Sequence, residues 1–310
     1  MHHAAHRLIS HQFQAVRLLR KEILDVTPGQ LRTAVDAVAR LYPGHRNTTV
    51  ERREVAGIPT DVVRSKNAID FDAPPVIWVH GGGFSFGSAR THRAAASHLA
   101  VHLGRPVWLP DYGLAPEHPF PHALKQVSSV ISEAISQHKS CDLVGDSAGG
   151  NLALASCLYR LGLRPGGEMA GEALKLPNSV SLLSPWLDLR LTSPSYTSNA
   201  ASSSLFDKGD MRYYSSFYLA GHPAGDVLTS PGVMDDSLLE KLPPVRLEST
   251  PPDYLHPDAQ AFHRRLIDAG RPVQWSEVPD VFHSWQLLPD VLPEASQSLI
   301  KLAEFINSTV

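Results

Sequence analysis

The 310-residue sequence has few cysteines, no excess of either charge and no long apolar run. Its two cysteines, Cys141 and Cys157, lie outside any CxxC or Cys/His cluster, which excludes a disulfide-stapled miniprotein and disfavours a metal site of that type. The 28 basic and 31 acidic residues leave a formal net charge of −3, so bulk electrostatics favour neither nucleic acid nor an anionic membrane. No stretch approaches the roughly 18 apolar residues of a spanning helix. We therefore expect a soluble, cytoplasmic protein with no nucleic-acid partner and no integral membrane segment.

The first 45 residues are predicted to be helical throughout. Apolar residues from Leu8 to Leu24 recur at helical spacing, and no apolar core follows a short basic start as in a secretory signal. The basic residues of this helix would suit a membrane surface, but packing on the protein's own body is the simpler interpretation. We expect residues 1–45 to form an N-terminal cap segment.

From residue 50 onward, short apolar segments alternate with longer stretches of helical periodicity, in a chain whose 43% apolar content is typical of globular proteins. Strands are expected at 50–55, 59–64, 75–79, 105–110, 141–145, 179–183, 244–247 and 272–278. Helices are expected at 91–103, 120–137, 148–161, 258–269 and 294–307. This alternation predicts an α/β fold with a mostly parallel sheet, formed by one catalytic domain over residues 46–310.

Residues 189–232 interrupt the alternation. The segment begins Ser/Thr-rich and continues into the aromatic-rich LFDKGDMRYYSSFYLAG. An insertion of this length is usually a lid or a binding element, although an irregular surface loop would fit its first half. We expect it to cover the site together with residues 1–45.

The strongest local pattern is G-x-S-x-G, which occurs as GDSAG at 145–149 between a predicted strand and a predicted helix. Small residues two places before and after the serine let the backbone pass through a sharp turn, as in a nucleophile elbow. Ser147 would then lie at a helix N-terminus, where backbone N–H groups favour developing negative charge. We interpret Ser147 as a nucleophile.

A glycine triplet, Gly81 to Gly83, follows His80 at the end of another predicted strand. Consecutive glycines let backbone N–H groups approach a ligand closely, although a merely flexible loop is the plainer alternative. In α/β hydrolases such a loop supplies oxyanion donors beside the N–H that follows the nucleophile, here that of Ala148. We expect His80 to orient this loop.

Four motifs in chain order resemble the hormone-sensitive-lipase-like group of α/β-hydrolase esterases: HGGGF (80–84), DYGLAPEHPFP (111–121), GDSAGGN (145–151) and SPWLD (184–188). The resemblance extends from about residue 45 to the C-terminus. It implies an α/β-hydrolase fold with helices on both faces of the sheet and a helical cap. It places the catalytic serine at Ser147 and the oxyanion donors at Gly82, Gly83 and Ala148. One departure is Gly113, where the family typically has an arginine that supports the neighbouring loop.

The same resemblance indicates the acid of a catalytic triad. In the family this residue follows a strand introduced by Pro-Pro and opens a D-x-L-x-x-x-[GA] segment, which matches Asp253. The strand before it is less apolar than in the family, because Arg246 and Glu248 replace apolar residues. Asp258 is the next candidate.

The catalytic base comes last in the Ser…Asp…His order of this fold. His283 follows the last predicted strand, in VPDVFHSWQLL, and is the predicted base. The family more often has His-Gly-Phe there, and Ser284-Trp285 is reminiscent of relatives that hydrolyse lactones or bulky alcohol esters. The other histidines are expected on solvated helices or in loops without partners, among them His45, His92, His98, His102, His138, His222, His256 and His263.

Together these residues predict a serine carboxylesterase that hydrolyses short- to medium-chain esters through an acyl-enzyme, with no metal and no organic cofactor. Its substrate would be a small-molecule ester or lactone, and a homodimer is left open. Aromatic pocket candidates, several of which core packing explains equally well, are Phe84, Phe206, Tyr213, Tyr214, Phe217, Tyr218 and Trp285. The alternatives are a lactone hydrolase, an amidase or a thioesterase with the same triad. A non-catalytic receptor is disfavoured by His283, which the receptors resembling this family lack.

Overall fold

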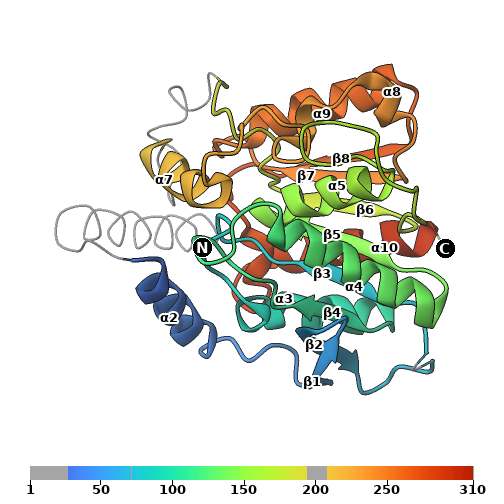
Figure 1. Cartoon of the computed structure of the whole chain (residues 1–310). Helices are drawn as coiled ribbons and strands as arrows, with labels where there is room; N and C mark the ends of the chain where they lie inside the picture. The colour runs from blue at the N-terminus through green and yellow to red at the C-terminus, as the bar shows by residue number, and fades with distance from the viewer. Residues whose placement is uncertain (1–26, 71, 194–207, 310) are drawn as a thin grey trace.

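The computed structural model describes residues 27–70, 72–193 and 208–309, and these form one eight-stranded sheet with helices on both faces (Figure 1). The strands are β1 (Thr48–Val55), β2 (Ile58–Ser65), β3 (Val76–Val79), β4 (Val107–Pro110), β5 (Asp142–Asp146), β6 (Val180–Leu183), β7 (Val245–Ser249) and β8 (Val273–Glu277). Their order is β1-β2-β4-β3-β5-β6-β7-β8. Only the β1–β2 and β2–β4 pairs are antiparallel, so the prediction of a mostly parallel sheet is confirmed.

Helices lie on both faces of the sheet and beside it (Figure 1). They are α2 (Pro28–Ala39), α3 (Ala89–Leu103), α4 (His122–His138), α5 (Ala148–Arg160), α7 (Lys208–Leu219), α8 (Asp236–Leu239), α9 (His256–Asp268) and α10 (Pro293–Ser308), with 3-10 turns η1 (Pro231–Val233) and η2 (Trp285–Leu287). Buried residues of α4, α5 and α9 pack in one apolar cluster, and those of α3 and α10 in another. Figure 1 shows α4 and α5 on the viewer's side of the sheet.

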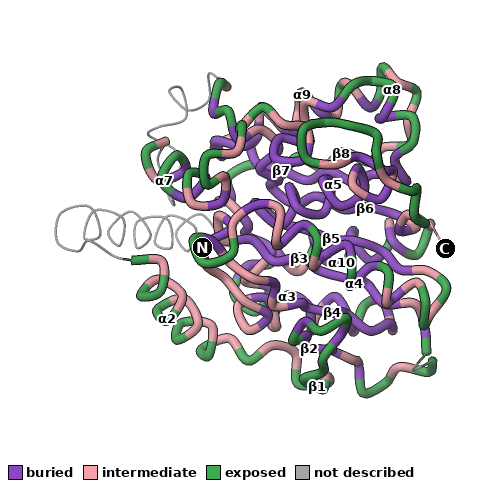
Figure 2. Tube along the Cα trace, viewed as in Figure 1, coloured by how far each residue is buried: buried purple, intermediate pink, exposed green. Residues whose placement is uncertain are grey.

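Successive side chains of β3 point to opposite faces of the sheet, so this strand contributes to the apolar cluster on each face. Val76 and Trp78 belong to the cluster of α3 and α10, whereas Ile77 and Val79 belong to the cluster of α4 and α5. All four side chains are completely buried, as the continuous apolar run predicts for a strand covered on both faces. Figure 2 shows this buried interior along the central strands.

Every strand and helix predicted between residues 50 and 307 is present, with ends displaced by no more than two residues. The prediction that residues 1–45 are wholly helical is wrong for its last part. Helix α2 begins after its N-cap Thr27, which forms a capping box with Gln30, and ends at Ala39, and residues 40–45 form no helix. The amphipathic pattern from Leu8 to Leu24 lies outside the described residues.

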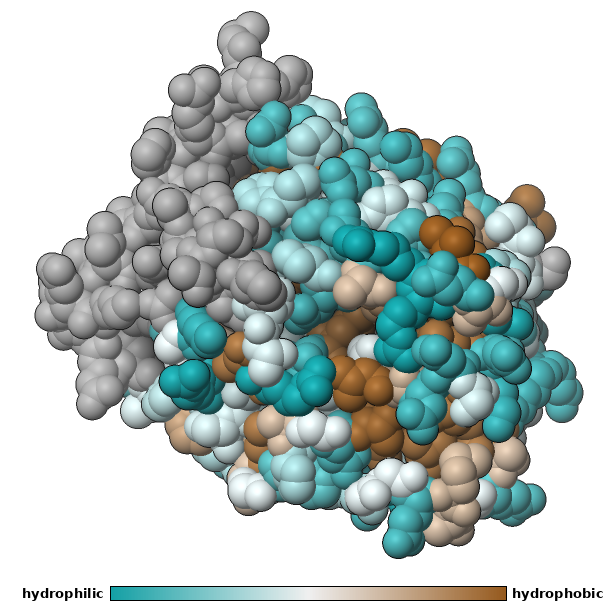
Figure 3. Space-filling model, turned by 90° about the horizontal axis from the view of Figure 1, so that it is seen from above, coloured by the Kyte–Doolittle hydropathy of each residue, from teal (hydrophilic) through white to brown (hydrophobic). Residues whose placement is uncertain are grey.

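The predicted insertion at 189–232 contains α7, and residues 194–207 of it lie outside the described part. In Figure 1, α2 and α7 lie on the left of the view, outside the main stack of sheet and helices. None of the helices in the described ranges combines the length and apolarity needed to cross a bilayer. The face in Figure 3 is mostly hydrophilic, with apolar residues gathered in a hollow near its centre.

Candidate active site

Ser147 lies in a sharp turn between β5 and α5. Its φ of 53° and ψ of −122° place a non-glycine residue in a strained region of backbone space. The turn closes only because its neighbours are small: a Cβ on Gly145 would collide with the carbonyl of Gly149, and one on Gly149 with the carbonyl of Val79. The G-x-S-x-G spacing thus has a direct steric cause, and the turn holds Ser147 at the first turn of α5.

Three sequence-predicted residues meet in a continuous hydrogen-bonded chain. The Nε2 atom of His283 lies 2.9 Å from Oγ of Ser147, and its Nδ1 atom lies 2.6 Å from Oδ2 of Asp253. Asp253 follows β7 and His283 follows β8, so neighbouring parallel strands deliver both side chains to the same edge of the sheet. The second carboxylate oxygen of Asp253 accepts the N–H of Leu255 at 3.1 Å, which fixes the carboxylate's orientation.

Opposing effects set the pKa of His283. Burial acts to lower the pKa of the imidazole, but the charge and hydrogen bond of Asp253, with a further contribution from Asp146, raise it above the ordinary histidine value. An imidazole in this environment is a stronger base than a free histidine. It is therefore well suited to accept a proton from Ser147.

Asp258, the other acid candidate, is not the residue that contacts His283. It lies on α9, where it is hydrogen-bonded to Ser193, and burial together with the nearby charge of Asp188 raises its pKa to about 7. A carboxyl group with a pKa this high is only partly ionised near neutral pH and stabilises an imidazolium poorly. The geometry and the charge both favour Asp253.

The glycine loop after β3 has a backbone that only glycine tolerates. Gly82 and Gly83 have φ values of 115° and 55°, and a Cβ on Gly82 would collide with the carbonyl of Phe86. Within the described chain, the N–H groups of Gly82, Gly83 and Ala148 make no hydrogen bond. The three predicted oxyanion donors are thus available to a ligand.

The side chain of His80 contacts the backbone of this glycine loop. Its Nδ1 atom lies 2.8 Å from the carbonyl oxygen of Gly81, and its ring stacks on Tyr112 with centroids 4.2 Å apart. The hydroxyl of Tyr112 donates to the carbonyl of His80 at 2.6 Å. Burial and the neighbouring His92 lower the pKa of His80 to about 4, so this imidazole is neutral at physiological pH and serves as a packed support.

Asp146 is the site residue that the sequence interpretation missed. Its Oδ1 atom accepts the Trp78 indole N–H at 3.0 Å and the Gly81 backbone N–H at 3.1 Å, and lies 2.9 Å from Nε2 of His92. One carboxylate therefore joins the Ser147 turn to the glycine loop. The available signal was an acidic residue directly before Ser147, at the end of a strand whose residues are all buried.

The expectation that the remaining histidines lack partners is wrong for several of them. His98 pairs with Asp290 at 2.8 Å, and His222 pairs with Asp226 at the same distance. His256, expected on a solvated helix, is buried and lies 3.1 Å from Ser249. Asp290 lies 192 residues from His98, so local pattern cannot reveal that partner, whereas the partners of His222 and His256 lie within seven residues of them.

The aromatic pocket candidates occupy different environments. Phe84 stacks on Tyr218 with ring centroids 3.9 Å apart, and both side chains are buried. Tyr214 of α7 packs so closely over Gly83 that a Cβ there would lie 3.3 Å from the tyrosine's own Cβ. Trp285 is fully buried in a separate cluster with Val281, Phe282, Leu292 and Ala295. Tyr213 is half exposed, and its ring centroid lies 4.6 Å from that of Phe217. Phe206 lies outside the described residues.

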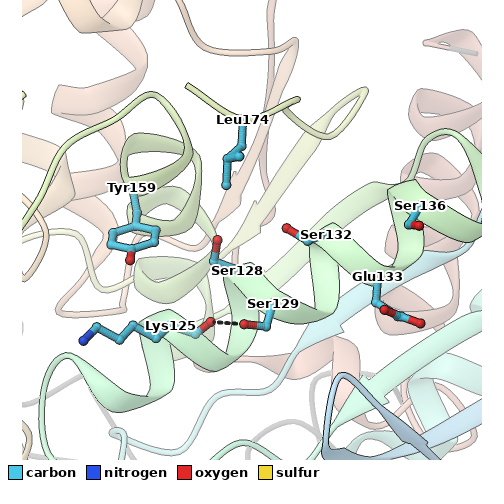
Figure 4. Close-up of a pocket in the computed structure, with 8 residues that line it drawn as sticks. All are labelled: Lys125, Ser128, Ser129, Ser132, Glu133, Ser136, Tyr159 and Leu174. Atoms are coloured by element: carbon cyan, nitrogen blue, oxygen red, sulfur yellow. Dashed lines mark hydrogen bonds between the residues drawn. The ribbon is translucent and has the colours of Figure 1, made fainter. Parts of the chain in front are cut away.

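A groove of about 560 Å³ lies elsewhere, between α4 and the segment after α5 (Figure 4). Its lining is mainly hydroxyl and charged groups: Lys125, Ser128, Ser129, Ser132, Glu133, Ser136, Tyr159 and Leu174. None of these belongs to the hydrogen-bonded chain of Ser147, His283 and Asp253. The groove is therefore separate from the candidate active site.

Cysteine and metal chemistry find no support in the described residues. Both cysteines are buried and free, and burial raises the pKa of each thiol to about 12, which makes them poor nucleophiles at neutral pH. Over residues 27–70, 72–193 and 208–309, no group of three or more His, Cys, Asp or Glu side chains is placed to hold a metal ion.

Comparison with known proteins gives consistent matches. The alpha/beta hydrolase fold family profile matches residues 76–287. An esterase of Acinetobacter venetianus is 33% identical over 291 residues, which cover 92% of this chain and 90% of the esterase. An acetyl-hydrolase of Streptomyces hygroscopicus is 32% identical over 76% of both chains. The crystal structure of an esterase from the bacterial hormone-sensitive lipase family superposes with a TM-score of 0.87 at 28% identity, covering 99% of this chain and 98% of the other.

Proposed function

The chain belongs to the hormone-sensitive-lipase-like family of α/β hydrolases and is a carboxylic ester hydrolase, and from this premise we propose that Ser147, His283 and Asp253 are its catalytic triad. The observation that carries the proposal is the hydrogen-bonded chain from Ser147 through His283 to Asp253, with distances of 2.9 Å and 2.6 Å. These distances are within the range expected for a nucleophile, its base and the group that orients the base.

Acylation begins when Oγ of Ser147 attacks the ester carbonyl carbon. His283 accepts the hydroxyl proton at Nε2, and Asp253 stabilises the imidazolium through Nδ1. The tetrahedral intermediate collapses, His283 gives the proton to the departing alkoxide, and an alcohol leaves. The acyl group remains on Ser147 as an ester.

The N–H groups of Gly82, Gly83 and Ala148 stabilise the oxyanion in this mechanism. All three are free of other hydrogen bonds in the described chain, and Ala148 is the first residue of α5. Loss of a single donor of this kind typically costs about 3 kcal/mol of transition-state stabilisation. Deacylation repeats the sequence, with water in place of Ser147 and the same imidazole as base.

The proposed substrates are esters with short to medium acyl chains. Tyr214 packs on the glycine loop, and the stacked Phe84 and Tyr218 fill space beside it, so bulky aromatic groups border the oxyanion donors. One relative of this chain is named an acetyl-hydrolase. Trp285, which suggested lactones or bulky alcohols, packs in a separate apolar cluster and gives that alternative no support.

Hydrolysis of p-nitrophenyl esters, from acetate to laurate, tests both parts of the proposal. Ser147→Ala should reduce kcat by about 10³-fold or more on every ester, because triad members act as a unit. A fluorophosphonate probe should label Ser147 in the wild type, as peptide mass spectrometry would show. The matched control is Ser129→Ala, an exposed serine on α4, which should leave both readouts unchanged.

Equal rates for the wild type and Ser147→Ala would overturn the triad assignment. We expect kcat/KM to be highest for short and medium chains, and a maximum at laurate would contradict the proposed substrate class. Lactones, p-nitroanilides and thioesters belong in the same panel. A kcat/KM for one of them above that for every p-nitrophenyl ester would replace the proposed substrate class.

A further inference from the structure

Strand β7, whose residues are all buried, contains two charged residues, Arg246 and Glu248. Both side chains are completely buried, and Nη2 of Arg246 lies 3.0 Å from Oε1 of Glu248. Burying two charges carries a desolvation penalty that their attraction often fails to recover, so such a pair is weak evidence for stability. The contacts of the pair point to a different role.

The Glu248 carboxylate joins three elements to β7. Its Oε1 atom accepts from Arg246 and from Ser276 of β8, each at 3.0 Å. Its Oε2 atom accepts from Nε2 of Gln286 in η2 at 3.1 Å and from the hydroxyl of Ser298 in α10. One buried carboxylate thus receives four hydrogen bonds, two on each oxygen.

One of these hydrogen bonds and the strand β7 itself both lead to the candidate triad. Gln286 lies three residues after His283, in the tight turn where Ser284 has a φ of 54° and Leu287 N–H bonds the Ser284 carbonyl at 3.1 Å. On the other side, β7 ends at Ser249 and the chain then leads to Asp253. Glu248 therefore connects the strand that delivers the acid to the turn that holds the base.

We propose that Glu248 is a positioning residue, which acts through Gln286 to hold His283 in register with Asp253 and Ser147. The inference rests on the proposed triad. The separations of 2.6 Å and 2.9 Å around His283 leave little tolerance, because a displacement of about 1 Å in a reacting group can cost about 10²-fold in rate.

The double variant Arg246→Leu/Glu248→Leu separates positioning from core stability. Replacing a buried ion pair by apolar side chains of similar size often leaves stability unchanged or higher. The Gln286 amide, however, loses its acceptor. We expect an unchanged or raised Tm, an unchanged KM and a kcat lowered about tenfold.

Glu248→Gln should behave in the opposite way. Its amide oxygen can remain on Arg246, and its NH₂ group can donate to Oε1 of Gln286, a buried atom that has no partner in the described structure. The link to the His283 turn survives, but Arg246 loses its counter-charge. We expect kcat within about threefold of the wild type and a lower Tm. Activity and stability thus move in opposite directions in the two variants, which a purely structural role does not produce.

Two single substitutions complete the test. Gln286→Leu should reproduce the loss of kcat with KM unchanged. Ser298→Ala removes the hydrogen bond between Glu248 and α10, a helix that follows all three triad residues in the chain, and it should leave kcat unchanged. In Gln286→Leu the acidic limb of the rate profile should also move to lower pH, because a displaced His283 loses the contact with Asp253 that raises its pKa.

Wild-type kcat and pH profile in both Gln286→Leu and the double variant would overturn the inference. If the double variant does not fold, Gln286→Leu alone decides the question. A wild type that hydrolyses no ester, or an active Ser147→Ala, would instead overturn the proposed triad. The two failures are therefore distinguishable.

Discussion

The Nε2 atom of His92 lies 2.9 Å from Oδ1 of Asp146, the residue immediately before Ser147. Both side chains are buried, and the same oxygen accepts the Gly81 N–H at 3.1 Å. Burial alone would raise the pKa of Asp146, but the charge and hydrogen bond of His92, with that of Trp78, hold it below the ordinary value. Asp146 therefore remains an ionised acceptor behind both the nucleophile turn and the glycine loop.

His92→Leu should lower kcat about tenfold while KM changes little, because the acceptor that holds the glycine loop would lose its partner. His92→Gln places an amide donor near the same position and should restore most of the activity. His102→Leu is the matched control, an exposed histidine later on α3. Steady-state kinetics on p-nitrophenyl butyrate measure all three. A wild-type kcat in His92→Leu would show that the loop keeps its shape without this pair.

The charge of Asp253 should be visible in the pH dependence of hydrolysis. His283 must be neutral to accept a proton, so kcat/KM falls as the pH drops through its pKa, which Asp253 raises against the opposing effect of burial. Asp253→Asn removes that charge, so the acidic limb should move to lower pH by about one unit or more. The plateau should fall about 10²- to 10⁴-fold. An acidic limb at the wild-type pH would contradict the assignment of Asp253.

Asp258 should affect stability rather than catalysis. Burial, followed by the charge of Asp188, raises its pKa in the folded protein to about 7, above the ordinary value of 3.8. Between these two pH values the unfolded chain releases the proton and the folded chain keeps it. This group therefore lowers the free energy of unfolding progressively from about pH 4 to pH 7, by up to about 4 kcal/mol.

Asp258→Asn removes this titration, so the variant should gain stability relative to the wild type as the pH rises through that range. Urea unfolding at pH 5 and pH 7.5 measures the difference. Its kcat should remain within a few-fold of the wild type. A loss of activity as large as that of Asp253→Asn would make Asp258 the acid instead.

The strands and the nucleophile turn were predictable because their causes are local. The run PVIWV is apolar on both faces, as a strand covered on both sides requires, and GDSAG has the small residues that a sharp turn requires. The residues of each segment are therefore enough to predict its structure. The order of the remaining motifs then places Asp253 and His283 after neighbouring strands. Their meeting with Ser147 follows from the parallel sheet.

The supporting contacts were not predictable, because their partners are far apart in the sequence. His92 and Asp146 are separated by 54 residues, and Glu248 and Gln286 by 38. From the sequence, Arg246 and Glu248 only made β7 less apolar than expected. The structure shows that Glu248 accepts hydrogen bonds from Arg246 and from Ser276. Helix α2, by contrast, ends at Ala39 shortly before Pro43 and Gly44, a local stop signal that the prediction of a helix to residue 45 overlooked.

The sequence has Gly113 where the family it resembles typically has an arginine, and the structure gives a physical cause for the glycine. A Cβ there would lie 2.7 Å from the ring of His122 and 2.9 Å from that of His118, and these two rings stack with centroids 4.4 Å apart. Backbone N–H of Gly113 donates to Gln126 at 2.6 Å. The stacked histidines therefore occupy the space that a side chain at this position would need.

Arg32 of α2 places a guanidinium against the loop that contains Gly113 and Ala115. It donates to the carbonyl oxygens of Ser85 and Ala115, each at 2.7 Å, and forms an ion pair with Glu117. Ser85 lies two residues beyond Gly83 of the glycine loop. Arg32 thus joins the N-terminal segment to the loop that carries the proposed oxyanion donors.

Arg32→Ala should lower kcat about three- to tenfold, because two carbonyl oxygens of the catalytic loops lose a charged donor. Arg32→Lys should not restore the activity, since one ammonium cannot span Ser85, Ala115 and Glu117 in the way a guanidinium fork does. Glu117→Gln should have a smaller effect, because its carboxylate is about half exposed and solvent screens the ion pair. Arg40→Ala, an exposed arginine at the end of α2, is the control. Equal kcat values for Arg32→Ala and Arg40→Ala would mean that α2 covers the loop without holding it in place.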